Sequence, residues 1–226
     1  MASPAALIGD PTRAAFLLAL SESDALPASE LARRARVSKS TASIQLGRLV
    51  AAGLLEVEPH GRHRYYRLAG PAVAQALEAL AVIAPRRLVR SLRESNRAAG
   101  IQLARTCYDH LAGVLGVELL EGLVRSGILV RQASEIDLSP AGAERLASLG
   151  VDLEAAHKSR RHFARLCLDW SERKYHLAGA LGSAITSRLF ELGWIERTGA
   201  GRAVRVTNKG RDGLRSLGVE APLGEA

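Results

Sequence analysis

The chain has few aromatic residues, few cysteines and no long apolar run, and each absence narrows its class. Phe, Trp and Tyr make up only 4% of the 226 residues, so Leu, Ala and Val must form the core, which favours helices. Two cysteines are too few for a small secreted domain held by several disulfides. No run of about 18 apolar residues is present, which argues against a membrane-spanning helix.

We also expect no signal peptide. The N-terminal residues have no cationic head, and Asp10-Pro11 interrupts their short apolar stretch. Together with the low cysteine content, this predicts a cytoplasmic, reduced protein with no membrane partner. Positive charge is in excess, because 31 Lys and Arg against 23 Asp and Glu give a formal net charge of +8. That charge suits a polyanionic partner such as nucleic acid, although an arginine-rich composition alone would also produce it.

The first seventy residues predict a helix-turn-helix unit. Asp10 followed by Pro11 is typical of a helix start, with a capping acid and then proline at the first helical position. A short helix over 29–35 and a tight turn over 35–37 then precede another helix, which is the helix-turn-helix spacing. Such turns often contain glycine at a position of positive φ, and here we expect Arg36 to take that conformation at a cost of about 1 kcal/mol.

The segment 37–49 predicts a helix with an apolar back and a small, polar front. Ala42, Leu46 and Leu49 recur at i, i+4 and i+7 and form the back. The opposite face is nearly uncharged and suits entry into the major groove of DNA. We therefore expect a recognition helix. Its expected DNA contacts are Ser38, Lys39, Ser40, Thr41, Ser43, Ile44, Gln45 and Arg48.

The expected roles differ along this helix. Ser38 can cap the first turn, where free backbone N–H groups and the helix dipole attract a phosphate. Ser43 and Gln45 can form hydrogen bonds with base edges, glutamine most naturally with adenine. Arg48 is expected to meet phosphate. Ile44 has two interpretations, contact with a thymine methyl group or burial in the core.

Two short alternating segments, 54–58 and 63–68, predict a β-hairpin with its turn at 59–62. A basic hairpin directly after a recognition helix is typical of the wing of a winged helix. Its arginines would meet phosphates or the adjacent minor groove. The expected DNA contacts of the wing are His60, Arg62, His63 and Arg64.

These motifs together carry a resemblance to a known family. They are Gly-Asp-Pro-Thr-Arg (9–13), Ala-Ser-Glu-Leu-Ala (28–32), Val-Ser-Lys-Ser-Thr-Ala-Ser-Ile-Gln-Leu (37–46), Ala-Gly-Leu-Leu (52–55) and Gly-Arg-His-Arg-Tyr-Tyr-Arg-Leu (61–68). The N-terminal third resembles an ArsR/SmtB-type winged helix-turn-helix transcriptional regulator. The resemblance implies a homodimer on a palindromic operator, usually a repressor that an inducer releases. Family members often sense metals through a cysteine pair in the second helix, but 29–35 contains no cysteine.

The expected organisation is two domains. Residues 1–84 would bind DNA and dimerise, the latter through a helix with the apolar stripe Val73, Leu77, Leu80 and Ile83. Residues 85–226 would form a sensing or assembly domain. It begins with a helix face that carries Arg86, Arg90, Arg93 and Arg97. That face either is simply solvated, extends the DNA footprint or binds an acidic partner.

The second domain contains an internal duplication. Ala-Arg-Thr-Cys-Tyr-Asp (104–109) resembles Ala-Arg-Leu-Cys-Leu-Asp (164–169), and the segment 108–116 resembles 174–182. Each copy, about 100–154 and 160–222, is interpreted as helix, helix, strand, turn, strand, helix. The expected fold class is therefore mainly α with small β-hairpins, an N-terminal winged helix-turn-helix followed by two degenerate winged-helix-like repeats.

The duplication places Cys107 and Cys167, and also His110 and His176, at matching positions, and three interpretations remain open. The four residues could bind one zinc ion, the only cofactor implied. Cys107 and His110 would share a helix face, but a straight helix would separate Cys167 from His176. The two cysteines could instead form a redox switch. All four could also simply pack, because free cysteine is commonly buried.

A fourth interpretation is a pocket for an organic effector. Its candidate residues are Tyr108, Asp109, Asp169, Trp170 and Tyr175, with Glu172 and Arg173 beside them. An enzyme using a cysteine, a histidine and an aspartate is the alternative class. We expect no enzyme, because the chain lacks a glycine-rich phosphate loop, a serine elbow and metallohydrolase spacing. A sequence-indifferent DNA binder is disfavoured by the uncharged face of 37–49.

Overall fold

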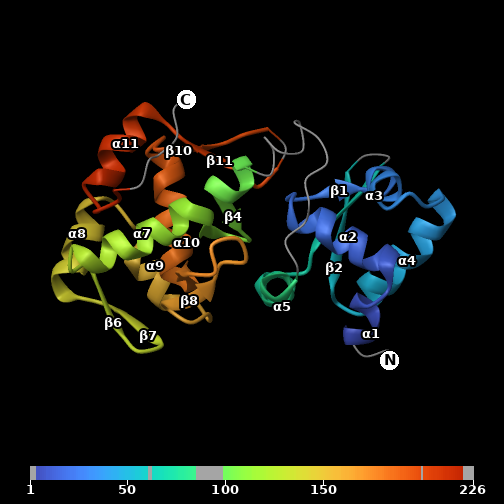
Figure 1. Cartoon of the computed structure of the whole chain (residues 1–226), viewed down its shortest axis with the longest axis horizontal. Coiled ribbons are helices and arrows are strands. Elements are labelled where there is room, and N and C mark those ends of the chain that lie inside the picture. The colour runs from blue at the N-terminus through green and yellow to red at the C-terminus, as the bar shows by residue number, and fades with distance from the viewer. Residues whose placement is uncertain (1–3, 61–62, 85–98, 200, 221–226) are drawn as a thin grey trace. The chain divides into compact units, whose positions relative to one another are not determined.

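The computed structural model describes residues 4–60, 63–84, 99–199 and 201–220 (Figure 1). The chain divides into two compact units, Met1–Leu77 and Glu78–Ala226. Within the described ranges helices predominate and every sheet is small and antiparallel, so the expected class, mainly α with small β-hairpins and an N-terminal winged helix-turn-helix, is confirmed. The winged-helix-like character of the two C-terminal repeats stays a prediction. None of the helices described is both long and apolar enough to cross a membrane. The arginine stripe over 86–97 lies outside the described residues.

The first unit contains the helix-turn-helix and its hairpin. Its elements are α1 (Pro4–Ile8), α2 (Pro11–Ser21), β1 (Leu26–Pro27), α3 (Ala28–Ala35), α4 (Lys39–Ala51), β2 (Leu55–His60) and β3 (His63–Leu68). The three strands form one sheet in the order β1-β3-β2. Because β1 directly precedes α3, this pairing ties the hairpin to the helices. Helix α5 (Pro71–Ile83) begins in this unit and ends in the second.

The helix boundaries follow from capping residues. Asp10 caps α2, its carboxylate accepting a hydrogen bond of 2.9 Å from the backbone N–H of Arg13, and Pro11 occupies the first turn. Arg36 ends α3 with φ 55° and ψ 43°, so the expected left-handed residue of the turn is confirmed. Gly53, with φ +70°, turns the chain out of α4 into the wing, a conformation that glycine adopts without a steric penalty.

The core of the first unit lies between three helices. Phe16 and Leu17 of α2, Leu31 of α3, and Leu46 and Leu49 of α4 are all fully buried. Burying a side chain of this size contributes roughly 1.5–3 kcal/mol. Helix α4 is therefore held along one face, and its other face is free for a partner.

The second unit contains two segments with the same order of elements: hairpin, helix, hairpin, helix. The first has β4 (Arg105–Cys107), β5 (His110–Ala112), α7 (Gly113–Arg125), β6 (Leu129–Gln132), β7 (Glu135–Leu138) and α8 (Pro140–Ser148). After α9 (Leu153–Lys158), the second has β8 (Arg165–Leu168), β9 (Tyr175–Ala178), α10 (Gly179–Glu191), β10 (Ile195–Arg197), β11 (Val204–Val206) and α11 (Asn208–Arg215).

Each copy begins with a β-hairpin, where the sequence interpretation placed a helix, so that interpretation is wrong. The segments 105–112 and 165–178 are antiparallel β-hairpins, in which Cys107 pairs with His110 and Cys167 with His176. Tyr108 takes a left-handed φ of 59° at the first hairpin's two-residue turn, which closes the chain where a helix would continue. A short apolar run does not by itself distinguish a strand from a helix.

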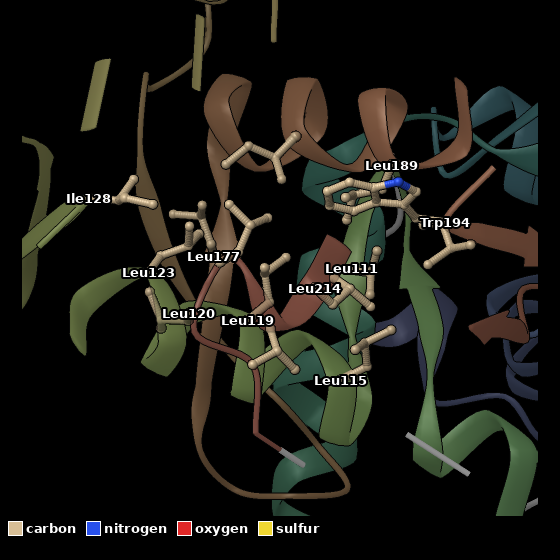
Figure 2. Packing of buried hydrophobic residues seen from close by; sticks show 14 of the residues in the cluster. Leu111, Leu115, Leu119, Leu120, Leu123, Ile128, Leu177, Leu189, Trp194 and Leu214 are labelled. Atoms are coloured by element: carbon tan, nitrogen blue, oxygen red, sulfur yellow. The ribbon is translucent and has the colours of Figure 1, made fainter. Parts of the chain in front are cut away.

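The two copies pack into each other around one core. Helix α7 packs against β9 of the other copy, and α10 packs against β5. A Cβ atom on Gly116 would lie 2.6 Å from the backbone oxygen of Leu111, and one on Gly182 would lie 2.6 Å from that of Leu177. Glycine therefore lets each helix begin close against the hairpin of its own copy. Figure 2 shows side chains of both copies, among them Leu111, Leu115, Leu177 and Leu189, in one cluster.

Candidate functional site

The start of α4 is built as predicted. The Ser38 hydroxyl oxygen accepts a hydrogen bond of 3.1 Å from the backbone N–H of Thr41, and it also lies 2.8 Å from the Ser40 hydroxyl. This small cluster of hydroxyl groups is exposed, at the helix end where the dipole is positive. The first turn is thus shaped to receive a phosphate, which stays a prediction.

The two faces of α4 differ as the spacing predicted. Ala42, Leu46 and Leu49 are buried, whereas Ser43, Gly47 and Arg48 are exposed. Ile44 is 59% exposed, so of its two interpretations burial in the core is wrong. Its contact with a thymine methyl group stays a prediction.

Gln45 lies at the edge between these faces and has an internal partner. Its side-chain oxygen accepts a hydrogen bond of 2.9 Å from Nη1 of Arg13. Arg13 is buried and also donates to the backbone oxygens of Leu7, at 2.7 Å, and Ala6, at 3.0 Å. Arg13 thus joins α1 to the recognition helix. Arg13 was not predicted as a site residue from the sequence, although its position three before Phe16 places it on the buried stripe of α2.

The wing is partly described. His60 and Arg64 are exposed, and the His60 ring lies edge-on to Tyr65 with centroids 6.1 Å apart. Arg67 is engaged by Glu56 at 2.7 Å and Glu58 at 2.9 Å. Arg62 and the side chain of His63 lie outside the described residues. Arg64 is therefore the described arginine of the wing that best fits a phosphate contact.

Helix α5 has one buried and one exposed side. Of the predicted apolar stripe, Leu77 is buried and Val73 is half-buried, so this inner part belongs to the core, together with the buried Ala74. The exposed side is apolar too, with Ala72, Ala76, Ala79, Leu80 and Ile83 at i, i+4, i+7, i+8 and i+11. Leu80 is 45% exposed and Ile83 is 79% exposed. Such an uncovered apolar helix face is typical of a helix that packs against another.

A second cluster lies inside the second unit, where the two hairpins meet. Paired residues of an antiparallel hairpin project to the same side, so each hairpin presents one cysteine and one histidine together. The structure brings all four of the predicted residues together. The sulfur atoms of Cys107 and Cys167 and one ring nitrogen from each of His110 and His176 lie within 4.8 Å of one another. All four side chains are buried, and both cysteines are free.

Each histidine of this Cys/His cluster faces the centre with one nitrogen and a carboxylate with the other. The two Nε2 atoms are 3.2 Å apart. Nδ1 of His110 lies 3.2 Å from Oδ1 of Asp109. Nδ1 of His176 lies 3.3 Å from Oδ2 of Asp169, close enough for an ion pair although without hydrogen-bond geometry. The two aspartates occupy matching positions in the duplication.

Arginines hold both carboxylates in place. Asp169 accepts two hydrogen bonds from Nη2 of Arg105, at 3.0 and 2.9 Å, and one of 2.7 Å from the backbone N–H of Gly113. Asp109 is paired with Arg161. Neither arginine was predicted from the sequence, because charged residues within an apolar segment carry no periodic signal. Arg105 is nevertheless the residue that directly begins the duplicated Arg-x-Cys motif.

The acidities of these groups reflect their contacts. Burial alone would raise the pKa of Asp109, but hydrogen bonds with His110 and Arg161 outweigh it and lower that pKa to about 2. Burial disfavours a charged His176, yet Asp169 and Cys167 outweigh it and raise the pKa of His176 to about 9. The pKa of Cys167 is lowered because Cys107 donates a hydrogen bond to its sulfur and both histidines face it. The pKa of Cys107 is raised correspondingly by its contact with Cys167.

The residues expected to line an effector pocket are engaged in contacts with other parts of the chain. Asp169 is buried among hydrogen-bond donors, and Asp109 is paired with Arg161. Trp170 and Tyr175 are exposed and lie beneath Arg105 and Arg131, respectively. Tyr108 forms the hairpin turn. A surface hollow between α9 and α10 is lined by other residues, among them Arg161, Ser183 and Arg188. The effector pocket stays a prediction.

The fold and the exposed face of α4 define a DNA-binding protein of the helix-turn-helix class, and comparison with known proteins agrees. A family model described as a helix-turn-helix domain matches residues 8–58. The chain is 44% identical over 211 residues to YdfF of Bacillus subtilis (strain 168), described as an uncharacterized HTH-type transcriptional regulator, and the match covers 93% of each chain. The chain therefore belongs to the HTH-type transcriptional regulators, which confirms the winged helix-turn-helix resemblance.

Solved structures match about a third of the chain. NolR from Sinorhizobium fredii is 25% identical, with a TM-score of 0.33, and the match covers 35% of this chain and 78% of NolR. The transcriptional repressor BigR from Xylella fastidiosa is 25% identical, with a TM-score of 0.34 and coverage of 37% and 84%. HlyU from Vibrio cholerae N16961 is 26% identical, with a TM-score of 0.32 and coverage of 34% and 82%.

Proposed function

We propose that the chain is a homodimeric, sequence-specific repressor of the ArsR/SmtB type that binds a palindromic operator. The observation that carries the proposal is the exposed face of α4, where Ser43 and Ile44 form an uncharged strip beside the exposed Arg48, opposite a fully buried back. A non-specific DNA binder depends mainly on positive charge. This face instead offers hydroxyl and methyl groups, which suit the edges of base pairs in the major groove.

The wing and the first turn of α4 supply the contacts that position the protein. Arg64 is exposed on β3, and the Ser38 cap leaves the N-terminal backbone of α4 open to a phosphate. Such contacts fix the register on the duplex and carry no sequence information themselves. We infer that Ser43 and Ile44 specify the sequence, whereas Arg64 and the first turn of α4 provide affinity.

The exposed face of α5 supports the homodimer. Five apolar residues lie along it, and four of them fall within the segment 76–83. Three of the five are alanines, whose small side chains let a partner helix approach closely. A two-fold dimer would place two copies of α4 on successive half-sites and so match a palindrome.

We infer that an effector acts on the second unit and changes DNA binding through α5. Glu78 of α5 is buried, and its carboxylate lies 3.9 Å from Nη2 of Arg105 and 3.9 Å from Nη2 of Arg202. Arg105 also binds Asp169, which faces His176. Charged contacts therefore link the Cys/His cluster to the helix that begins directly after the wing.

Selection of bound sequences from a random pool of duplex DNA tests the proposed function. The account expects enrichment of one inverted repeat with half-site centres about one helical turn, roughly 34–36 Å, apart. A reporter placed behind that sequence should be expressed less when the protein is present. Recovery of unrelated sequences, or a single unrepeated half-site, would contradict the proposal.

A further inference from the structure

We propose that Cys107, His110, Cys167 and His176 bind one Zn²⁺ ion in a closed tetrahedral site that joins the two copies of the duplication. Two sulfur and two imidazole ligands are a donor set that zinc takes in structural sites. Each copy contributes one cysteine and one histidine, so neither copy can form the site alone.

The distances fit this coordination. In a zinc tetrahedron with Zn–N bonds of about 2.0–2.1 Å, two ligand nitrogens lie roughly 3.4 Å apart. The Nε2 atoms of His110 and His176 are 3.2 Å apart. All four ligand atoms lie within 4.8 Å of one another, so small side-chain rotations suffice to place them around one ion.

The backbone presents the ligands in advance. Cys107 and His110 are directly paired in one hairpin, and Cys167 and His176 in the other. The opposing helices fix the histidines, since a Cβ atom on Gly116 would lie 3.5 Å from Cβ of His176 and one on Gly182 would lie 3.5 Å from Cβ of His110. The duplicated hairpins thus carry the donors on strands rather than on a loose loop.

The surrounding carboxylates orient the imidazoles as in a metal site. A zinc-bound histidine usually directs its other ring nitrogen to a carboxylate or a carbonyl group. Asp109 and Asp169 occupy that position for His110 and His176. In the structure the two Nε2 atoms are joined by a hydrogen bond of 3.2 Å. A zinc ion would replace the proton of that bond and accept a lone pair from each nitrogen.

The charges also balance. Two thiolates neutralise Zn²⁺, and binding displaces two protons from the cluster to solvent. The adjacent aspartates are matched by Arg161 and Arg105. All four ligands are buried, so no coordination position is left for a water molecule. The site is therefore one that stabilises structure, and a hydrolytic role does not follow from it.

Metal analysis of the full-length protein, purified under reducing conditions, tests the site. Elemental analysis after reconstitution with zinc should give one ion per chain. Replacement with Co²⁺ should give the ligand-field absorption of tetrahedral cobalt and a thiolate-to-cobalt charge-transfer band. His176→Asn should lose the bound zinc and the cobalt spectrum while leaving two titratable thiols. His162→Asn, which changes an exposed histidine, should keep the zinc and the cobalt spectrum.

A milder variant separates metal binding from folding. Asp109→Asn leaves all four ligands in place and should weaken zinc affinity about 10- to 100-fold. Asp137→Asn changes an exposed aspartate on β7 and should leave the affinity unchanged. Far-ultraviolet circular dichroism of each variant shows that the chain is folded before affinities are compared.

Three results would overturn the proposal. The first is a reduced, folded wild-type chain that binds no stoichiometric zinc or cobalt. The second is metal binding that persists in His176→Asn, or a cobalt spectrum without thiolate charge transfer. The third is a Cys107–Cys167 disulfide in protein purified under reducing conditions, since that would support the redox interpretation of the same cluster.

Discussion

At the scale of single residues, two buried arginines hold the candidate sites in place. Arg13 joins the backbone of α1 to Gln45 on the recognition helix, and Arg105 holds Asp169 beside the Cys/His cluster. Hydrogen bonds to a charged group contribute roughly 1.5–3 kcal/mol, and a buried charge without a partner is costly. Both residues are therefore expected to be more sensitive to substitution than the exposed arginines of the chain.

Gln45 gives a prediction at this scale, because its side-chain oxygen accepts a hydrogen bond from Arg13 while the residue is only half-buried, next to the exposed face of α4. Gln45→Ala should lower the free energy of unfolding by about 1–3 kcal/mol, since Arg13 loses an acceptor. Gln45→Glu keeps an acceptor and should stay near wild type in stability, yet bind the operator more weakly because it adds a negative charge next to DNA.

Chemical denaturation and fluorescence anisotropy measure the two effects of Gln45 substitution separately. If Gln45→Ala unfolds at the wild-type denaturant concentration, the Arg13 contact does not stabilise the recognition helix. If Gln45→Glu binds operator and random DNA as the wild type does, the residue lies outside the interface.

Residue-level features were predictable where the cause is local. The caps Asp10 and Ser38 and the left-handed Arg36 depend on their immediate neighbours in sequence, and all three were found. Arg13 and Arg105 were not predicted because their partners lie 32 and 64 residues away, at Gln45 and Asp169. Only the folded chain brings those groups together.

At the scale of elements, helix α4 was predictable and the duplicated hairpins were not. Apolar spacing defined both faces of α4 over more than three turns. The duplicated motif around Cys107 is only six residues long (104–109), too short to show a clear periodicity. Cys107 and His110 are three apart, a spacing that fits one face of a helix and also the two ends of a two-residue turn. A straight helix would have separated Cys167 from His176 and so argued against a metal site. In the hairpin the two residues lie directly opposite each other, and that objection no longer holds.

The close packing of helix on hairpin gives a prediction at this scale. Gly116→Ala places a Cβ atom 2.6 Å from the backbone oxygen of Leu111, so α7 must shift away from the hairpin. We expect a loss of about 1–3 kcal/mol in the free energy of unfolding of the second unit. Differential scanning calorimetry of the full chain measures it.

Gly47→Ala is the matched control for this substitution. Gly47 lies in α4 with nothing within 4 Å of an added Cβ, so alanine should stabilise that helix by roughly 0.5–1 kcal/mol. Equal effects of the two substitutions would show that the hairpin does not pack against α7 as closely as described.

At the scale of the whole molecule, the account requires a dimer. Leu80→Glu introduces a charge on the exposed apolar face of α5 and should give a monomer in solution, with operator affinity reduced because one α4 then acts alone. Val130→Glu changes a residue of nearly equal exposure, 43% against 45%, on the hairpin β6–β7. It should leave the dimer intact.

Light scattering during size-exclusion chromatography at micromolar concentration measures this difference. A wild-type monomer would contradict the homodimer, and a dimeric Leu80→Glu would place the interface elsewhere than on α5. Either result leaves the description of α4 unaffected, so dimerisation and DNA recognition are tested independently.

The central claim is that α4 specifies the DNA sequence while the wing supplies affinity. The direct test is the ratio of dissociation constants for random and operator DNA, measured for wild type, Ser43→Ala and Arg64→Ala at several salt concentrations. Ser43→Ala should lower the ratio, by the equivalent of about 0.5–1.5 kcal/mol, the contribution of a single hydrogen bond. Arg64→Ala should weaken binding to both DNAs and reduce the salt slope by about 1, with the ratio unchanged. A ratio that Ser43→Ala leaves intact would contradict the claim.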